Sequence, residues 1–252
     1  MAQFSANLGF LWTDVPLPDA IRRAATAGFD AVECHFPYDV DVDEVNAALD
    51  ETGLPMLGLN TKRGDAIAGD FGLAALKGRE SEARSAITQA LDYSHAIGCR
   101  NVHVMAGKGG DERTFLSNLA FAAYEARDLG IGVLIEPINH YDAEDYFLSE
   151  IEQAAEYVEV IGAPNLKIMF DCYHVQVMQG DLERRLKAHL PLVGHIQIAA
   201  APSRGEPNGG EISYDRLIPA IDAMGYDGFI GAEYKPSTTT DEGLGWMTAF
   251  SS

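Results

Sequence analysis

Four oxygen-bearing side chains stand at or near the ends of short apolar segments in the second half of the chain. They are Glu136 in VLIEPINH, Asp171 in LKIMFD, Gln197 in HIQI and Glu233 in GFIGAE. Each interval between neighbours is about the length of one strand–helix unit. Oxygen-only ligands favour Mg2+ or Mn2+ over Zn2+, which prefers nitrogen and sulfur. We therefore predict that these four residues bind a divalent metal ion.

The segments that carry these residues have the composition of buried parallel strands. A short run of Val, Leu and Ile that a proline ends, as in VLIEP, suits a strand covered on both faces. Similar runs predict eight strands, at Phe4–Leu8, Ala31–Cys34, Met56–Leu59, Asn101–Met105, Val133–Glu136, Leu166–Asp171, His195–Ile198 and Gly228–Glu233. Helices are predicted at Pro18–Ala27, Asp43–Glu51, Glu80–Ile97, Asp111–Leu129, from Ser149, at Leu182–Leu190, at Tyr214–Met224, and briefly after Thr240.

Glycine separates a helical segment from a strand-like one six times, at Gly28, Gly53, Gly98, Gly130, Gly162 and Gly225. A glycine just past a helix adopts the left-handed conformation that closes the last turn. Ser149 and Glu152 have the spacing of a capping box, which would start the fifth helix. The repeat predicts a single-domain (β/α)8 TIM barrel over residues 1–252. Active sites of such barrels lie at the carboxyl ends of the strands, so the four metal-ligand candidates would converge there.

Composition and charge exclude several classes of partner. The chain has 18 Lys and Arg against 38 Asp and Glu, a formal charge of −20, whereas a nucleic-acid phosphate backbone needs a basic surface. The first residues lack the pattern of a signal peptide, and no apolar run approaches the length of a membrane span. Cys34, Cys99 and Cys172 lack metal-type spacing and suit reduced, buried thiols. We expect a cytoplasmic protein without nucleic-acid or membrane partners, and the sequence is compatible with a homo-oligomer.

Several longer motifs resemble those of one enzyme family. LIEPINH, LKIMFDCYHVQVMQGD, GHIQIAAAPSRGEPNGGEISY and AEYKPSTTT are similar to hydroxypyruvate isomerases, in the xylose-isomerase-like barrel superfamily, as are FSANLGFL and ECHFPYDVDVDEV nearer the N-terminus. The resemblance covers essentially the whole chain. It implies that Glu136, Asp171, Gln197 and Glu233 bind the metal and that Glu136 and Glu233 act as proton donor and acceptor. The chain departs from the family mainly before Glu136, in GLNTKRGD and in the short turn after Gly107.

The chemistry of such an isomerase agrees with these residues. A proton leaves the carbon that bears the hydroxyl and returns to the neighbouring carbonyl carbon, through an enediolate that a divalent cation stabilises. A carboxylate must lie within reach of that carbon. Glu136 and Glu233 are predicted on non-adjacent strands and could flank a substrate.

An anionic substrate needs cations near the acidic cluster, and the loops supply Lys62, Arg63, Lys108, Arg204 and Lys235. Arg204 is the first candidate because a guanidinium can form two parallel hydrogen bonds to a carboxylate, although a salt bridge to Glu206 or Glu211 is an equal alternative. Lys108 is the second candidate. His174, three residues after Asp171, is predicted to contact substrate or to orient the ligand shell. Asn60, which begins the long Gly- and Ala-rich loop that reaches Arg79 and is a candidate lid, completes the predicted substrate-binding set.

Other functions share some of these features. An isomerase of a longer 2-oxo acid such as 2-oxo-tetronate, or a ketose 3-epimerase, would use the same metal site with different pocket loops. The substrate is therefore a small anionic 2-oxo or hydroxy acid, or a sugar. A metal-dependent abasic-site nuclease of the same superfamily would need more histidine ligands and a basic face. A non-catalytic sugar- or metal-binding barrel would have no use for two glutamates at one metal.

Overall fold

Eight parallel strands surrounded by helices form the computed structural model, which describes residues 2–250. Residues 1, 251 and 252, which the predicted domain included, lie outside the described residues. The strands are β1 Phe4–Asn7, β2 Ala31–Glu33, β3 Gly58–Asn60, β4 Asn101–His103, β5 Gly132–Ile135, β6 Leu166–Asp171, β7 Val193–Ile198 and β8 Ile230–Ala232. The helices are α1 Leu17–Ala27, α2 Val42–Thr52, α3 Glu80–Ala96, α4 Glu112–Arg127, α5 Ile151–Ile161, α6 Cys172–Met178, α7 Leu182–His189, the 3-10 turn η1 Leu190–Leu192, α8 Tyr214–Ala223, α9 Thr240–Gly243 and α10 Gly245–Phe250.

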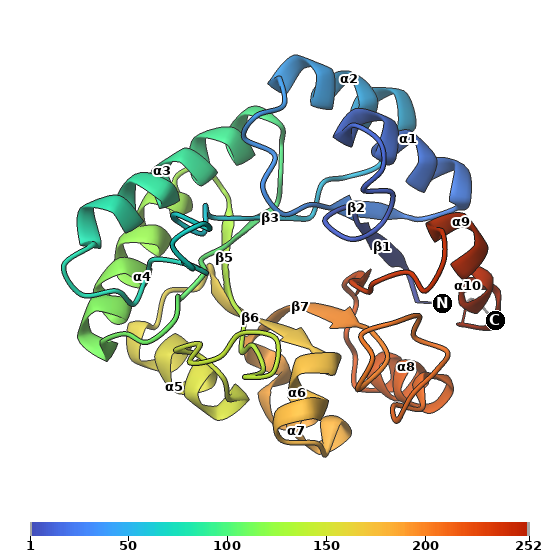
Figure 1. The fold of residues 1–252 in the computed structure, drawn as a ribbon. Helices are drawn as coiled ribbons and strands as arrows, with labels where there is room; N and C mark the ends of the chain where they lie inside the picture. Colours follow the sequence, from blue (N-terminus) through green and yellow to red (C-terminus); the bar gives the residue numbers. More distant parts are fainter. Residues whose placement is uncertain (1, 251–252) are drawn as a thin grey trace.

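The strands pair in the order β2-β1-β8-β7-β6-β5-β4-β3. The sheet closes through a short parallel bridge between Val32 and Met56, where Cys34 N donates to Gly58 O over 3.0 Å. Figure 1 shows the strands at the centre and the helices around them, with β1 and α10 close together. Phe4 of β1 and Trp246 of α10 make an edge-to-face ring contact at 5.2 Å there. The predicted (β/α)8 barrel is confirmed.

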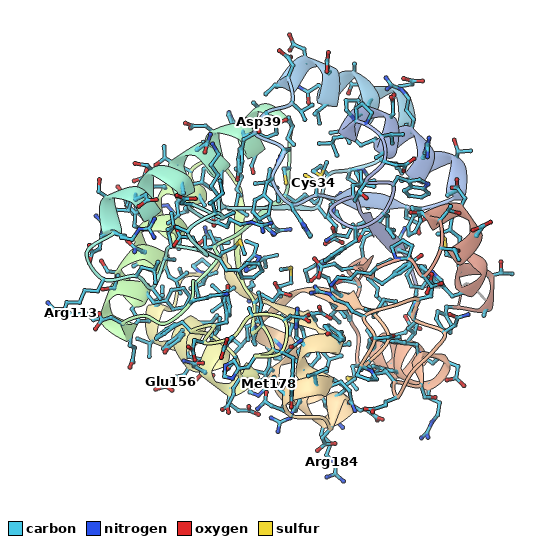
Figure 2. All side chains as sticks on the ribbon, viewed as in Figure 1. Cys34, Asp39, Arg113, Glu156, Met178 and Arg184 are labelled. Atoms are coloured by element: carbon cyan, nitrogen blue, oxygen red, sulfur yellow. The ribbon has the colours of Figure 1, made fainter. Side chains whose placement is uncertain are left out.

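The helices form because small and branched apolar residues recur on one face. In α1, for example, Ala20, Ile21 and Ala24 are buried, and this spacing places them on the side that meets the strands. The core therefore lies between the strands and the ring of helices. Figure 2 shows Cys34 near the barrel, whereas charged side chains such as Arg113 and Arg184 project from the outer edge.

The six glycines predicted to end helices all have positive φ, from 64° at Gly98 to 88° at Gly28. The predicted capping box is wrong, because the N-cap of α5 is Glu150, whose own side chain makes no capping hydrogen bond. Instead Gln179 Oε1 accepts from Ile151 N at 3.0 Å, so a neighbouring segment supplies the missing acceptor. Helix α6, which begins directly after Asp171, was not among the predicted helices.

Cys34, Cys99 and Cys172 are free and buried, as the sequence predicts. Among the described residues, no helix combines the length and the apolar character needed to cross a membrane.

Candidate metal centre and active site

Four buried side chains come together at the carboxyl ends of the strands. Glu136 follows β5, Asp171 ends β6, His174 lies in the first turn of α6 and Glu233 follows β8. One ligand-type atom from each residue lies within 4.8 Å of the corresponding atoms of the other three. Gln197 is at the same level, because the parallel register pairs it with Asp171 on the neighbouring strand. The barrel thus brings all four predicted metal ligands to one end.

Three oxygen atoms in this cluster are buried without a hydrogen-bond partner among the described residues. They belong to three of the predicted ligands: Glu136 Oε1, Asp171 Oδ2 and Gln197 Oε1. Buried polar atoms without partners are rare, and a bound ion is one explanation for a group of them. Because all three are hard oxygen donors, the residues fit a hard divalent cation.

The orientation of the Gln197 amide follows from its neighbour Glu33. Gln197 Nε2 donates to Glu33 Oε2 at 2.7 Å, which leaves the amide oxygen as the atom without a partner. Ser5 Oγ donates to Glu33 Oε1 at 2.7 Å, and His195 Nε2 lies 3.1 Å from the same oxygen. Glu33 is thus the centre of a buried polar network that fixes the orientation of the Gln197 amide.

The two glutamates have opposite electrostatic surroundings. Burial raises the pKa of Glu136 well above its usual value, and the carboxylates of Glu233 and Asp171 raise it further. Burial alone would also raise the pKa of Glu233, but Arg204 and a hydrogen bond from His35 outweigh burial and lower the pKa to about 2. Burial raises the pKa of Asp171 to about 7 even though Arg204 opposes the shift. Without a metal ion, these surroundings therefore favour the charged form of Glu233 and the protonated form of Glu136.

Glu233 has three donors of its own. Asn7 Nδ2 donates to Oε1 at 2.9 Å, His35 Nε2 lies 3.0 Å from the same oxygen, and Arg204 Nη2 donates to Oε2 at 2.6 Å. Sequence reasoning missed Asn7 and His35. The available signal was their position, since Asn7 ends β1 and His35 follows β2, at the same end of the barrel.

The hydrogen bonds of His174 assign its tautomer. Its Nδ1 accepts from the backbone N–H of Asn139 at 3.2 Å and faces Asn139 Nδ2 at 2.7 Å. Burial, assisted by Arg204, lowers the pKa of His174 well below the usual value, so the ring is neutral. A neutral imidazole whose Nδ1 accepts carries its proton on Nε2. Nε2 lies 3.5 Å from Asp171 Oδ2 and can donate to an oxygen atom in the site.

Arg204 is committed to acidic groups of the site. Its guanidinium pairs with Asp142 at 3.0 Å and with Glu233 at 2.6 Å, and it lies 3.8 Å from Asp171. The alternative of a salt bridge to Glu206 or Glu211 is wrong; Glu206 instead accepts from Ser237 N at 2.8 Å. The guanidinium also packs over the rings of Phe10 and Tyr173, at 4.8 and 5.2 Å.

A cavity of about 320 Å³ opens above the cluster and has the size of a site for a small molecule. Asn60, His174 and Arg204, three of the predicted substrate-binding residues, line it, whereas Lys108 does not. Lys108 is exposed and lies beside Tyr146 in a separate hollow, because the turn after β4 bends toward the loop before α5. The cavity is lined by Gly9, Phe10, His35, Phe36, Asn60, Arg63, Phe71, His103, Met105, Glu136, Ile138, Asp142, His174, Arg204, Glu233 and Lys235.

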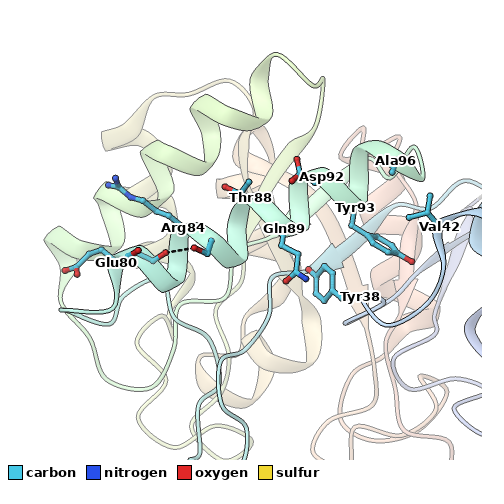
Figure 3. Close-up of a pocket in the computed structure, with 11 residues that line it drawn as sticks. Tyr38, Val42, Glu80, Arg84, Thr88, Gln89, Asp92, Tyr93 and Ala96 are labelled. Carbon is cyan, nitrogen blue, oxygen red and sulfur yellow. Dashed lines mark hydrogen bonds between the residues drawn. The ribbon is translucent and has the colours of Figure 1, made fainter.

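A larger hollow of about 960 Å³ lies on the outer side of α3. Figure 3 shows Gln89 and Tyr93 on the side of α3 that faces Tyr38. The lining of this larger hollow contains no group of acids and histidines like the cluster at the strand ends. The smaller central cavity, not this groove, is therefore the candidate active site.

Comparisons with known proteins agree with this fold and site. The model of the xylose isomerase-like TIM barrel family matches residues 21–250, so the chain belongs to that family. It is 44% identical to a 2-oxo-tetronate isomerase of Cupriavidus necator over 99% of both chains. It is 39% identical to the hydroxypyruvate isomerase of Escherichia coli (strain K12), over 99% of this chain and all of the relative. The predicted resemblance and the prediction of an isomerase are confirmed.

A solved structure with 38% identity and a TM-score of 0.95 covers 99% of both chains and is described as an AP endonuclease of family 2 from Brucella melitensis. A 3-keto-D-glucoside 4-epimerase from E. coli, with a TM-score of 0.84 and 22% identity, covers 98% of this chain and 99% of its own, and supports the fold alone.

Proposed function

We propose that this protein is a metal-dependent isomerase of small α-hydroxy-keto acids. The first candidate reaction is the interconversion of hydroxypyruvate and 2-hydroxy-3-oxopropanoate, which is also called tartronate semialdehyde. The buried cluster of Glu136, Asp171, His174 and Glu233, with partnerless oxygens under a small cavity, carries this proposal. Relatives named hydroxypyruvate isomerase and 2-oxo-tetronate isomerase support it.

Glu136, Asp171, Gln197 and Glu233 would hold Mg2+ or Mn2+. When bound, the ion would supply positive charge that stabilises the enediolate as it develops. Glu136 and Glu233 would move the proton between the two carbons. His174 Nε2–H would donate to a substrate oxygen, and the Arg204 guanidinium, while still paired with Glu233, would lie beside the substrate, because both residues line the cavity.

The nearest alternative substrates are 2-oxo-tetronate and neutral ketoses, since they share the reacting α-hydroxy-carbonyl group. Nuclease activity is disfavoured, despite the name given to the Brucella structure, because the chain carries a formal charge of −20. We place the reaction in the cytoplasm, with no nucleic-acid or membrane partner, and we allow for a homo-oligomer.

Proton NMR of the purified, Mg2+- or Mn2+-loaded protein with hydroxypyruvate, 2-oxo-tetronate or a free ketose tests the proposal. We expect turnover of an acid, its loss after chelation, and its recovery when the metal ion is returned. Full activity in protein shown to be metal-free would refute the metal dependence. Turnover of ketoses alone would transfer the assignment to a ketose epimerase.

A further inference from the structure

The substrate of the proposed reaction has a carboxylate that needs a cation, and Arg204 is already engaged. Its guanidinium pairs with Glu233 and Asp142 and lies near Asp171. A substrate carboxylate at this point would compete with two ion pairs and would face the acidic cluster. A second cation, farther from the cluster, would bind the carboxylate without that competition.

Arg63 is such a cation. It is half-buried, lines the central cavity, and comes from the loop that follows β3. Its guanidinium lies 4.4 Å from the centre of the Phe36 ring and 5.5 Å from that of Phe71. Two aromatic contacts restrict a long side chain, so less conformational entropy is lost when the guanidinium binds an anion.

The acids nearest to Arg63 in its own loop have other partners. Asp70 pairs with Arg79 at 2.8 Å and accepts from Asp65 N at 2.8 Å. Asp65 Oδ1 accepts from the backbone N–H groups of Ile67 and Ala68. Among residues 2–250, no carboxylate forms an ion pair with Arg63 in the structure, so its charge is available to a ligand.

Arg63 and Arg204 pack on different members of one aromatic wall. Phe10 contacts the His35 ring at 5.1 Å, and His35 contacts Phe36 at 5.9 Å. Arg204 packs over Phe10, next to Glu233, whereas Arg63 packs over Phe36. Because Arg63 lines the same cavity as Glu136 and Glu233, a substrate whose reacting carbons lie at the metal ligands would have its other end directed toward Arg63.

On the basis of the proposed function, we propose that Arg63 binds the substrate carboxylate and makes the enzyme prefer acids over neutral α-hydroxy ketones. A guanidinium forms two parallel hydrogen bonds to a carboxylate and none of that kind to a hydroxymethyl group. Lys235 also lines the cavity, but it is exposed and its ammonium lies 5.9 Å from the Phe10 ring, on the Arg204 side.

Binding of D-glycerate and glycerol to the Mg2+-loaded protein, measured by calorimetry, tests this role independently of turnover. The two compounds differ only in whether one end is a carboxylate or a hydroxymethyl group. We expect Arg63→Gln to weaken D-glycerate binding about ten- to hundred-fold, the scale of a charge-assisted hydrogen bond, and to leave glycerol binding unchanged. Arg63→Lys keeps the positive charge but cannot form two parallel hydrogen bonds to the carboxylate. Its affinity for D-glycerate should therefore lie between those of the unaltered protein and Arg63→Gln.

Lys62→Gln is the matched control, because it removes the same charge one residue earlier from an exposed side chain that packs over Tyr38 at 5.4 Å. Equal losses in Lys62→Gln and Arg63→Gln would mean general charge attraction and overturn the role of Arg63. Unchanged glycerate binding in Arg63→Gln, loss only in Lys235→Gln, or no glycerate binding by the unaltered protein would also overturn it. Thermal unfolding of each variant shows whether a loss of D-glycerate binding comes from misfolding. If Arg63→Gln is misfolded, the affinity of Arg63→Lys for D-glycerate decides the role of Arg63.

Kinetics with hydroxypyruvate and dihydroxyacetone, which differ by the same exchange of end group, extend the test to catalysis. We expect Arg63→Gln to lower kcat/KM for hydroxypyruvate mainly through KM, and to leave dihydroxyacetone unaffected. If the unaltered protein binds glycerate through Arg63 but isomerises no hydroxy-keto acid, the proposed function fails while the anion site stands.

Discussion

Glu136 and Glu233 occupy equivalent places after their strands, yet their neighbours shift their pKa values in opposite directions. Glu136 faces other carboxylates in a buried site, whereas Glu233 receives hydrogen bonds from Asn7, His35 and Arg204. Pairs of titratable groups whose pKa values are pushed apart are common where one group gives and the other accepts a proton. The geometry therefore suits a proton-transfer role for both residues, beyond that of holding a metal ion.

Glutamine variants separate these two roles, because an amide keeps an oxygen for the metal but cannot carry the proton. We expect Glu136→Gln and Glu233→Gln to bind metal and a substrate analogue yet to lose turnover by about 10²-fold or more. Solvent deuterium exchange into substrate would stop in one variant if a single base works on one face, and in both if two bases work.

Metal content must be measured on each variant before its rate is interpreted, since both residues are proposed ligands. Glu211→Gln, at an exposed glutamate in the loop after β7, is the control for a simple loss of charge. A variant with full metal occupancy and a near-normal rate would remove that residue from proton transfer.

Strand β8 leads directly into Glu233 and also leaves a space at Gly231, where a side chain would otherwise lie. Gly231 lies opposite Ser5 on one side and Gln197 on the other. A Cβ atom on Gly231 would lie 2.3 Å from Glu33 Oε1 and 2.9 Å from Gln197 Cγ. The glycine therefore leaves room for the buried network that orients the Gln197 oxygen.

Gly231→Ala should weaken metal binding and also lower stability, because the added methyl group must displace Glu33, His195 and Gln197. Overpacking of this kind typically costs about 1–3 kcal/mol. Equilibrium unfolding and metal titration of the variant measure the two effects. Gly228→Ala tests a glycine just before the same strand, where the nearest clash is with the Tyr226 side chain. If Gly231→Ala binds metal normally, the network does not position Gln197.

The four strand ends that carry the metal-ligand candidates could be predicted from the sequence. Each combines an apolar run with an oxygen-bearing side chain, which is a local pattern. The helix α6 could not, because Tyr173, Val175 and Val177 are poor helix formers, and its start depends on Asp171 accepting from Tyr173 N. The ion pair between Arg204 and Glu233 also lay beyond local patterns. It depends on a loop in which Arg204 itself has a positive φ of 55°.

The molecule as a whole pays a stability cost for burying acids at one end of its barrel. Asp171 and Glu136 have raised pKa values in the folded, metal-free protein, so the native state binds their protons more tightly than the unfolded chain does. Their contribution to stability is therefore lost as pH rises through the folded pKa, which is about 7 for Asp171. Glu233 has the opposite sign, because its pKa of about 2 gives stability that is lost only in acid.

Buried histidines limit the pH range in which this effect can be seen. Burial lowers the pKa of His103 to about 4, so its contribution to stability rises with pH up to its unfolded value of 6.5 and is constant above it. His174, also shifted downward, behaves in the same way. Between pH 6.5 and 8 the two carboxyl groups therefore dominate the pH dependence of this site.

In that range we expect the Tm of the metal-free protein to fall as pH rises, and to fall less in Asp171→Asn, which cannot titrate at this position. Mn2+ should raise the Tm of the unaltered protein more at pH 8 than at pH 6.5, because the metal competes with protons for the same oxygens. Calorimetry in EDTA and in excess Mn2+ measures both effects. The same slope in Asp171→Asn and the unaltered protein would show that Asp171 is already ionised without metal. A Tm that Mn2+ leaves unchanged at pH 8 would show that the cluster does not hold the ion.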